Sequence, residues 1–135
     1  MPLGQLWAQP KNFWNVLAEV HFLKKKDAGG FVVEVPQFSQ HLRSYQAKKI
    51  RLKGYVIPVS ESGSGKFMLS MLPINVCYFC GAAGPETVVE VDTTEQIEFT
   101  TQAIVLEGIL KLNPTDPDRH IYILEKARRV TQGSD

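Results

Sequence analysis

Alternating polar and apolar residues mark the middle of the chain. Between residues 50 and 57, Ile50, Leu52 and Val56 would point to one side of an extended strand, and the residues between them to the other. Further β-rich runs, separated by proline, glycine and acidic turn residues, cover residues 66–72, 87–91, 103–112 and 121–124. The pattern predicts a mainly β protein whose five principal strands begin near residue 50.

The first third of the chain has helical spacing in two places. The apolar residues concerned are Phe13, Trp14 and Leu17, and then Phe38, Leu42 and Tyr45. Each set falls on one side of a helix, so we expect a short helix over residues 10–20 and a second one around residue 42. Both helices are expected to pack on the strands that follow.

A polar break separates these two segments. It contains Lys24, Lys25 and Lys26, followed by an aspartate and a Gly-Gly pair, and we interpret the three lysines as a solvated loop. A short β-rich run over residues 31–35 comes next, and Pro36 is expected to end it.

Two of the long strands share a sequence pattern. Residues 50–54 and 104–108 both read Ile-x-Leu-x-Gly. Glycine weakens a strand, and its use at the same point of two strands is explained by a sharp bend or a close backbone approach in a small closed barrel. We therefore expect these to be strands one and four of a five-stranded Greek-key barrel with the OB-fold arrangement.

Length and composition indicate one ordinary globular domain. The chain has 135 residues, of which 44% are hydrophobic and 21% charged. We expect a single OB-like domain over residues 10–130, with a disordered leader or signal remnant at 1–9 and a flexible tail at 131–135. A formal net charge of +1 does not indicate bulk attraction to nucleic acid or to an anionic membrane. No apolar run approaches the roughly 20 residues that a transmembrane helix needs.

Two segments resemble a known family. They read Lys-Gly-Tyr-x-x-Pro at residues 53–58 and Cys-x-x-Cys-Gly-x-x-Gly-Pro-Glu at residues 77–86. They are similar to small exported bacterial proteins, often lipoproteins, that are grouped only as a domain of unknown function, and the Cys-Gly form is similar to members from Bacteroidetes-type bacteria. The resemblance covers about residues 31–126. It implies an OB-like fold and an exported, periplasmic or envelope-associated location, but no established activity. No lipobox cysteine is present, so lipid anchoring is not expected.

The cysteine segment leaves three interpretations open. Cys77 and Cys80 can be structural, can bind a metal, or can form a disulfide or redox pair. On a straight strand their Cα atoms would lie about 10 Å apart, beyond the roughly 7 Å that a disulfide allows, so the two thiols cooperate only where the chain turns. Glu86 is the nearest oxygen ligand, and zinc is the metal that such a site would suit. The histidines are scattered and none has ligand spacing.

A second candidate site lies on the first barrel strand. Lys49, Arg51, Lys53 and Tyr55 would share its outer face. Such a surface in an OB-fold binds single-stranded nucleic acid or an oligosaccharide through charge and ring stacking. A solvent-facing strand is also commonly decorated in this way, and we expect Glu107 on the matching face of strand four to offset part of the charge.

These observations predict a non-enzymatic binding or accessory module of the cell envelope, because no motif for hydrolysis is present. We prefer a metal-linked role through Cys77, Cys80 and Glu86, with zinc as the candidate cofactor. The alternatives are a single-stranded nucleic-acid or oligosaccharide binder and a thiol-redox protein. An envelope protein or a second copy of the chain is the expected partner, and the net charge disfavours nucleic acid.

Overall fold

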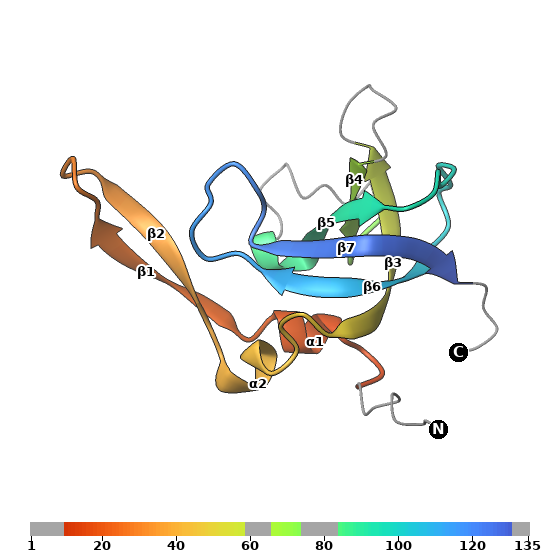
Figure 1. Cartoon of the computed structure of the whole chain (residues 1–135), viewed down its shortest axis with the longest axis horizontal. Coiled ribbons are helices and arrows are strands. Elements are labelled where there is room, and N and C mark those ends of the chain that lie inside the picture. Colours follow the sequence, from red (N-terminus) through yellow and green to blue (C-terminus); the bar gives the residue numbers. More distant parts are fainter. Residues whose placement is uncertain (1–9, 59–65, 74–83, 131–135) are drawn as a thin grey trace.

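The structure, a computed structural model, describes residues 10–58, 66–73 and 84–130. In chain order its elements are α1 (Trp14–Leu17), β1 (Val20–Lys26), β2 (Val32–Phe38), α2 (Gln40–Arg43), β3 (Lys49–Pro58), β4 (Lys66–Ser70), η3 (Pro85–Thr87), β5 (Val88–Thr93), β6 (Ile104–Leu112) and β7 (Tyr122–Val130). Figure 1 shows two parts: a barrel of five strands, and a hairpin of β1 and β2 that projects away from it.

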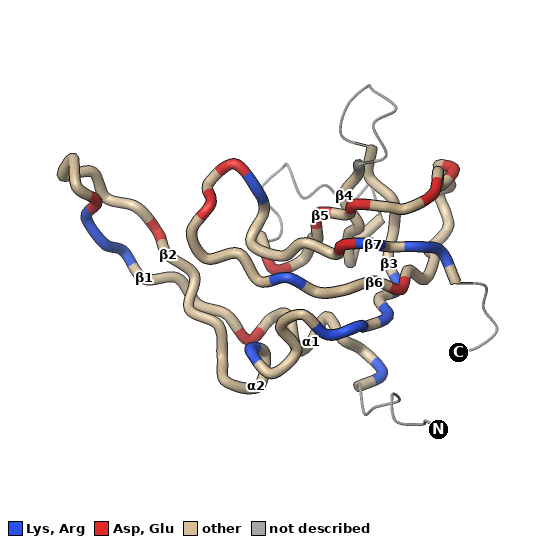
Figure 2. The backbone as a smooth tube through the Cα atoms, viewed as in Figure 1, with Lys and Arg blue, Asp and Glu red and all other residues tan. Residues whose placement is uncertain are grey.

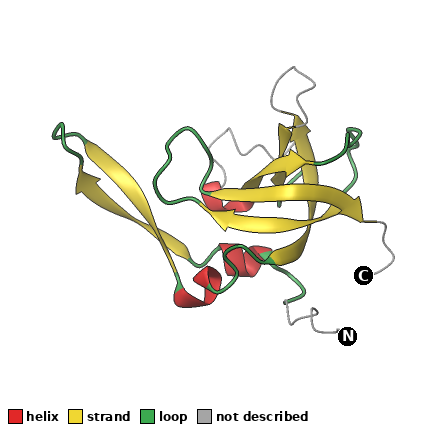
Figure 3. Ribbon diagram, viewed as in Figure 1, coloured by secondary structure: helices red, strands yellow, loops and turns green. Residues whose placement is uncertain are grey.

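The barrel closes in the order β3-β4-β5-β7-β6. Every neighbouring pair is antiparallel except β5 and β7, which run parallel. In barrel numbering this order is 1-2-3-5-4, with strand one returning to strand four, which is the Greek-key arrangement of an OB-fold. The predicted fold class is therefore confirmed: the protein is mainly β, with an OB-like barrel and a few short helices (Figure 3).

The two Ile-x-Leu-x-Gly segments close the barrel by pairing with each other. Ile50 lies opposite Gly108, and Gly54 lies opposite Ile104. A Cβ atom on Gly54 would lie 2.6 Å from the carbonyl oxygen of Ser70, and one on Gly108 would lie 2.8 Å from that of Glu125. Real Cβ atoms essentially never come so close, so both positions require glycine because the backbone of a neighbouring strand passes there.

The barrel core continues into the N-terminal helices. Alternate residues of β3 point inward, and Leu52 packs with Leu69 and Leu106 in one buried cluster. α1 contributes Leu17 to the same cluster, and the Tyr122 hydroxyl on β7 donates a hydrogen bond to the Leu17 carbonyl oxygen. α1 is therefore fixed to the barrel by both packing and a buried hydrogen bond.

The second helix forms as the sequence indicates. Phe38 and Leu42 are buried, and Tyr45 packs against the core. The helix begins after Ser39, whose hydroxyl oxygen accepts a hydrogen bond from the Leu42 N–H at 2.9 Å, and this side chain caps the helix.

Between the helices, the sequence-based interpretation was wrong in three places. α1 ends at Leu17 instead of residue 20, and β1 runs through Lys24, Lys25 and Lys26, which were interpreted as a loop. Likewise β2 continues past Pro36 to Phe38. The hairpin is a two-stranded sheet, in which both strands are edges, and an edge strand accepts a proline that lacks an N–H donor.

The last strand is also longer than the pattern predicts. β7 runs from Tyr122 to Val130 and not only to residue 124. Lys126 has a positive φ of 55°, and the register with β6 shifts opposite this point. This irregularity breaks the polar–apolar alternation, so the second half of the strand could not be predicted from alternation. No helix in the described ranges is long and apolar enough to cross a membrane.

We predict that Gly54→Ala lowers the free energy of unfolding by about 2 kcal/mol, because the added methyl group forces β3 away from the Ser70 carbonyl. Gly84→Ala is the matched control: its Cβ would meet only the end of the flexible Glu86 side chain, which can move. Thermal or urea unfolding of the two variants measures the difference. Equal losses of stability would contradict the role assigned to Gly54.

Candidate ligand-binding site

The outer face of β3 carries the residues that the alternation placed there. Lys49, Arg51 and Lys53 are exposed, and Tyr55 is half-buried. The intervening residues point into the barrel. The predicted orientation is therefore confirmed, whereas a ligand-binding role for these four residues stays a prediction.

Three of these four residues line a pocket of about 310 Å³ between β3 and the segment that leads into α1. Lys49 lies outside it. The complete lining consists of Lys11, Asn12, Phe13, Trp14, Arg51, Leu52, Lys53, Gly54, Tyr55, Met71 and Ala103. The strand face alone is thus not the site, because the N-terminal segment forms the opposite wall.

Trp14 holds the two walls together. Its indole Nε1–H donates a hydrogen bond to the Lys53 carbonyl oxygen at 2.8 Å, and its backbone N–H donates to Asn12 Oδ1 at 3.1 Å. The ring fits because Gly54 has no side chain: a Cβ atom there would lie 3.2 Å from the Trp14 ring. The glycine that lets the barrel close therefore also makes room for the indole. Trp14 is only 7% exposed, so it serves mainly as a wall.

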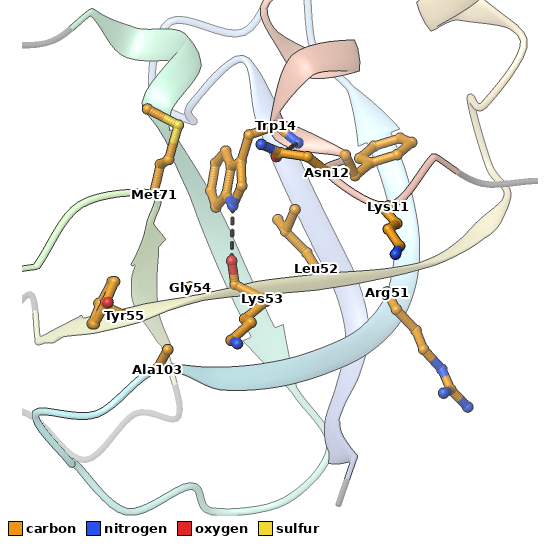
Figure 4. A pocket seen from close by; sticks show the side chains of 11 residues that line it. Lys11, Asn12, Trp14, Arg51, Leu52, Lys53, Gly54, Tyr55, Met71 and Ala103 are labelled. Carbon is orange, nitrogen blue, oxygen red and sulfur yellow. Dashed lines mark hydrogen bonds between the residues drawn. The ribbon is translucent and has the colours of Figure 1, made fainter. Parts of the chain in front are cut away.

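The pocket has chemically different ends. In Figure 4, Met71 and Tyr55 lie on one side of Trp14, while Lys11 and Arg51 lie on the other. The first end offers a thioether and an aromatic ring, and the second offers two cations. Such a pocket suits a ligand that combines a ring with an anionic group.

Glu107 on β6 partly neutralises the positive charge beside the pocket. Its carboxylate accepts a hydrogen bond from Arg51 Nε at 3.2 Å and another from Arg128 at 3.0 Å. Burial disfavours the charged carboxylate, but the Arg51 hydrogen bond and the charges of Arg128, Arg51 and Lys49 outweigh it, so the pKa of Glu107 lies below its ordinary value. This ion pair confirms the expected position of Glu107.

Positive charge still predominates on this side of the molecule. Figure 2 shows lysine and arginine along the first half of β3, on the segment before α1 and at the end of β7. The cations concerned are Lys11, Lys48, Lys49, Arg51, Lys53, Arg128 and Arg129. Two carboxylates of the described residues lie among them: Glu107 pairs with Arg51 and Arg128, and Glu95 accepts a hydrogen bond from the Arg129 backbone N–H at 3.2 Å. The cations outnumber the carboxylates, so the local charge is positive although the net charge of the chain is +1.

The predicted metal site falls largely outside the described residues. Cys77 and Cys80 both lie there, and only Glu86, on η3, is within the described part. In the described ranges, no three His, Cys, Asp or Glu side chains gather as a metal site requires. The zinc hypothesis therefore stays a prediction.

Two of the three histidines that were judged unsuitable as ligands have other partners. His120 Nε2 lies 2.9 Å from the Pro85 carbonyl oxygen, which can only accept, so this nitrogen carries the proton. Burial lowers the pKa of His120, and the ring is neutral at pH 7. His41 pairs with Glu19 at 3.2 Å. His120 thus contacts η3 from the segment before β7, and His41 contacts the residue that precedes β1.

Sequence reasoning missed the residues of the opposite wall. Lys11 carried no signal, and Trp14 was assigned to the packing side of a helix, a role that its burial supports. Met71 lies 16 positions after Tyr55 in the sequence, and Ala103 lies 48 positions after it. Only the closed barrel brings these two residues to the same pocket as Tyr55.

No family model and no curated protein matches this chain. Among solved structures, a DUF3299 family protein from Pseudomonas aeruginosa PAO1 is a distant structural neighbour. The two chains are 15% identical, and the superposition covers 73% of this chain and 70% of that one with a TM-score of 0.47. The resemblance of the cysteine segment to exported proteins of Bacteroidetes-type bacteria stays a prediction.

We predict that Glu107→Gln lowers the free energy of unfolding by about 1 kcal/mol at pH 7, because Arg51 and Arg128 lose their shared anionic partner. The pKa of Glu107 is depressed in the folded state, so its contribution is present above the ordinary value of 4.5 and is lost as the pH falls through the lower folded value. The difference from wild type should therefore shrink below pH 4.5.

Urea unfolding over a pH series measures this dependence. Glu125→Gln is the control, because among the described residues the Glu125 carboxylate makes one ion pair, an exposed contact of 3.9 Å with Lys111, and should change stability little. A Glu107→Gln difference that stays constant down to low pH would show that charge is not its cause.

Proposed function

We propose that the protein is a non-enzymatic binding module that holds an acidic oligosaccharide against β3. The observation that carries this proposal is the pocket between β3 and the N-terminal segment, which has Tyr55 and Met71 at one end and cations at the other. One sugar ring fits a volume of about 310 Å³. Its carboxylate or phosphate group would face Lys11, Arg51 and Lys53, and further units of the chain would follow β3 towards Lys49.

The aromatic content of the site favours a sugar over a nucleic acid. Single-stranded nucleic acids bind to several aromatic platforms, one for each stacked base. Here Tyr55 is the aromatic side chain of the pocket with substantial exposure, since Phe13 and Trp14 are buried and the Trp14 N–H is already bonded to Lys53. A single ring platform beside cations supports recognition of one acidic sugar unit. Single-stranded nucleic acid is the runner-up ligand.

The proposed location is the cell envelope of a bacterium, with the protein exported. The support for this location is the resemblance of the segments at 53–58 and 77–86 to exported proteins, together with the proposed ligand, since acidic oligosaccharides are abundant in envelopes. A zinc site formed by Cys77, Cys80 and Glu86, and thiol-redox chemistry at the two cysteines, stay predictions. Neither is needed for the pocket to bind its ligand.

We predict that the full-length protein binds a labelled acidic oligosaccharide, such as an oligogalacturonate, more tightly than a neutral oligosaccharide of equal length. Tyr55→Ala should weaken binding about tenfold through the loss of ring stacking. Lys53→Gln should weaken it too, and should reduce the salt dependence by the equivalent of one ionic contact. Fluorescence anisotropy over a salt series measures both effects.

The matched control is Lys25→Gln, which removes the same charge from the hairpin, away from the pocket. This variant should bind the oligosaccharide as the wild type does. An oligothymidylate of similar length separates the two ligand classes, because tighter binding of the oligonucleotide would favour the runner-up. A ligand site on β3 would be refuted if the protein bound neither the acidic oligosaccharide nor the oligothymidylate. It would also be refuted if Lys53→Gln and Lys25→Gln weakened binding equally.

A further inference from the structure

The hairpin of β1 and β2 exposes an unusual share of apolar surface at its outer end. Leu23 is 42% exposed, Phe31 71%, Val32 61% and Val33 38%. Only two other large hydrophobic residues in the described ranges are comparably exposed, Met71 and Phe99, and both lie outside the hairpin. An isolated two-stranded hairpin gains little stability from its own contacts. An exposed apolar surface of this kind is typical of an interaction site.

The base of the hairpin is anchored, whereas its outer end projects (Figure 1). At the base, Pro36 and Phe38 are buried, and the Ser39 hydroxyl donates a hydrogen bond to the Glu19 carboxylate at 2.7 Å. Side chains become more exposed towards the turn, and the last four residues of β1 are all exposed. The hairpin therefore extends as an arm from a fixed support.

The turn at the end of the arm is well ordered by hydrogen bonds. Asp27 Oδ1 accepts from the Gly29 N–H at 2.9 Å and from the Phe31 N–H at 3.0 Å, and Gly30 takes the positive φ of 85° that the turn requires. The backbone of Asp27 also pairs with Phe31. The most exposed aromatic ring of the described chain is thus held at the tip before any partner arrives.

Three consecutive lysines lie directly behind this tip. Lys26 is paired with Val32, Lys25 with Val33 and Lys24 with Glu34. None of the three lysines makes an ion pair with a carboxylate in the described ranges. Two acidic side chains share the arm: the Asp27 carboxylate accepts the hydrogen bonds of the turn, and Glu34 is paired with Lys24, so three cations stand against two carboxylates. The tip therefore combines an apolar end with a net positive charge immediately behind it.

We propose that the tip of this hairpin inserts into the surface of a bilayer rich in anionic phospholipid. Phe31 and Val32 would enter the boundary between headgroups and acyl chains, and Lys24, Lys25 and Lys26 would contact the phosphate groups. The net charge of +1 does not oppose this contact, because a bilayer surface interacts with the charge that lies within a Debye length of it.

Strand addition by another protein fits the arm less well. Lysines on an edge strand oppose pairing with a new strand, and Pro36 in β2 lacks a donor for it. A stable protein interface also needs about 800 Å² from each partner. Four partly exposed apolar side chains at a narrow tip do not offer such an area, whereas shallow insertion into a bilayer does not require it.

Sedimentation of the full-length protein with vesicles tests this proposal. We expect binding to vesicles of phosphatidylcholine with phosphatidylglycerol, weak binding to phosphatidylcholine alone, and release by salt. Replacing the three lysines together by glutamine should weaken binding about 100-fold, or about fivefold for each lysine. Phe31→Ser should weaken it about tenfold. Because all four side chains are exposed, the melting temperature of these variants should stay close to that of the wild type.

Two variants outside the arm serve as controls. Phe99→Ser removes another exposed phenylalanine, and Lys53→Gln removes a lysine of the pocket, and both should bind vesicles as the wild type does. Loss of vesicle binding in Lys53→Gln but not in Phe31→Ser would overturn the proposal, as would failure to bind anionic vesicles at all. A concentration-dependent dimer that Phe31→Ser abolishes would assign the arm to a second copy of the chain instead. None of these results depends on whether the β3 pocket binds an oligosaccharide.

Discussion

The close approach of the backbone at Gly54 is the constraint on which this structure depends. At this position β3 leaves its partner β6 and begins to pair with β4, and the Ser70 carbonyl passes where a side chain would otherwise lie. Without that approach the five strands would not coil tightly enough to enclose one core. Gly108 lies on β6, the strand that pairs with the first half of β3. There the carbonyl oxygen of Glu125 on β7 makes the equivalent close approach.

The same absence of a side chain shapes the candidate site. The indole of Trp14 lies over Gly54 and bonds to the neighbouring carbonyl oxygen, which fixes the N-terminal segment at a set distance from β3. The space left between them is the pocket, and the outward alternation of β3 supplies its charged residues. Barrel closure, the position of α1 and the presence of a pocket are thus consequences of one local packing arrangement. Glu107 then limits the repulsion among the cations around it.

The barrel could be predicted from the sequence because its signals are local. Alternation in β3 and the repeated Ile-x-Leu-x-Gly segments both report on single strands, and the repeated glycine implies their close packing. Most of β2 was predicted, but β1 was missed because Lys24, Lys25 and Lys26 break any apolar alternation, and their strand conformation depends on pairing with Val32, Val33 and Glu34 across the turn. The site was half-predicted: the β3 side chains follow from alternation, whereas Lys11 and Met71 reach the pocket only through long-range packing.

The claim that β3 and the N-terminal segment form one ligand site is tested most directly by the Trp14 indole N–H, because its hydrogen bond to Lys53 joins the two walls. A nuclear magnetic resonance titration of the ¹⁵N-labelled protein with an acidic oligosaccharide should shift this signal together with the amides of Lys11, Lys53 and Tyr55. The shifts should saturate with a single affinity and diminish in high salt. Saturable shifts elsewhere, with the Trp14 and Lys53 signals unchanged, would contradict the account.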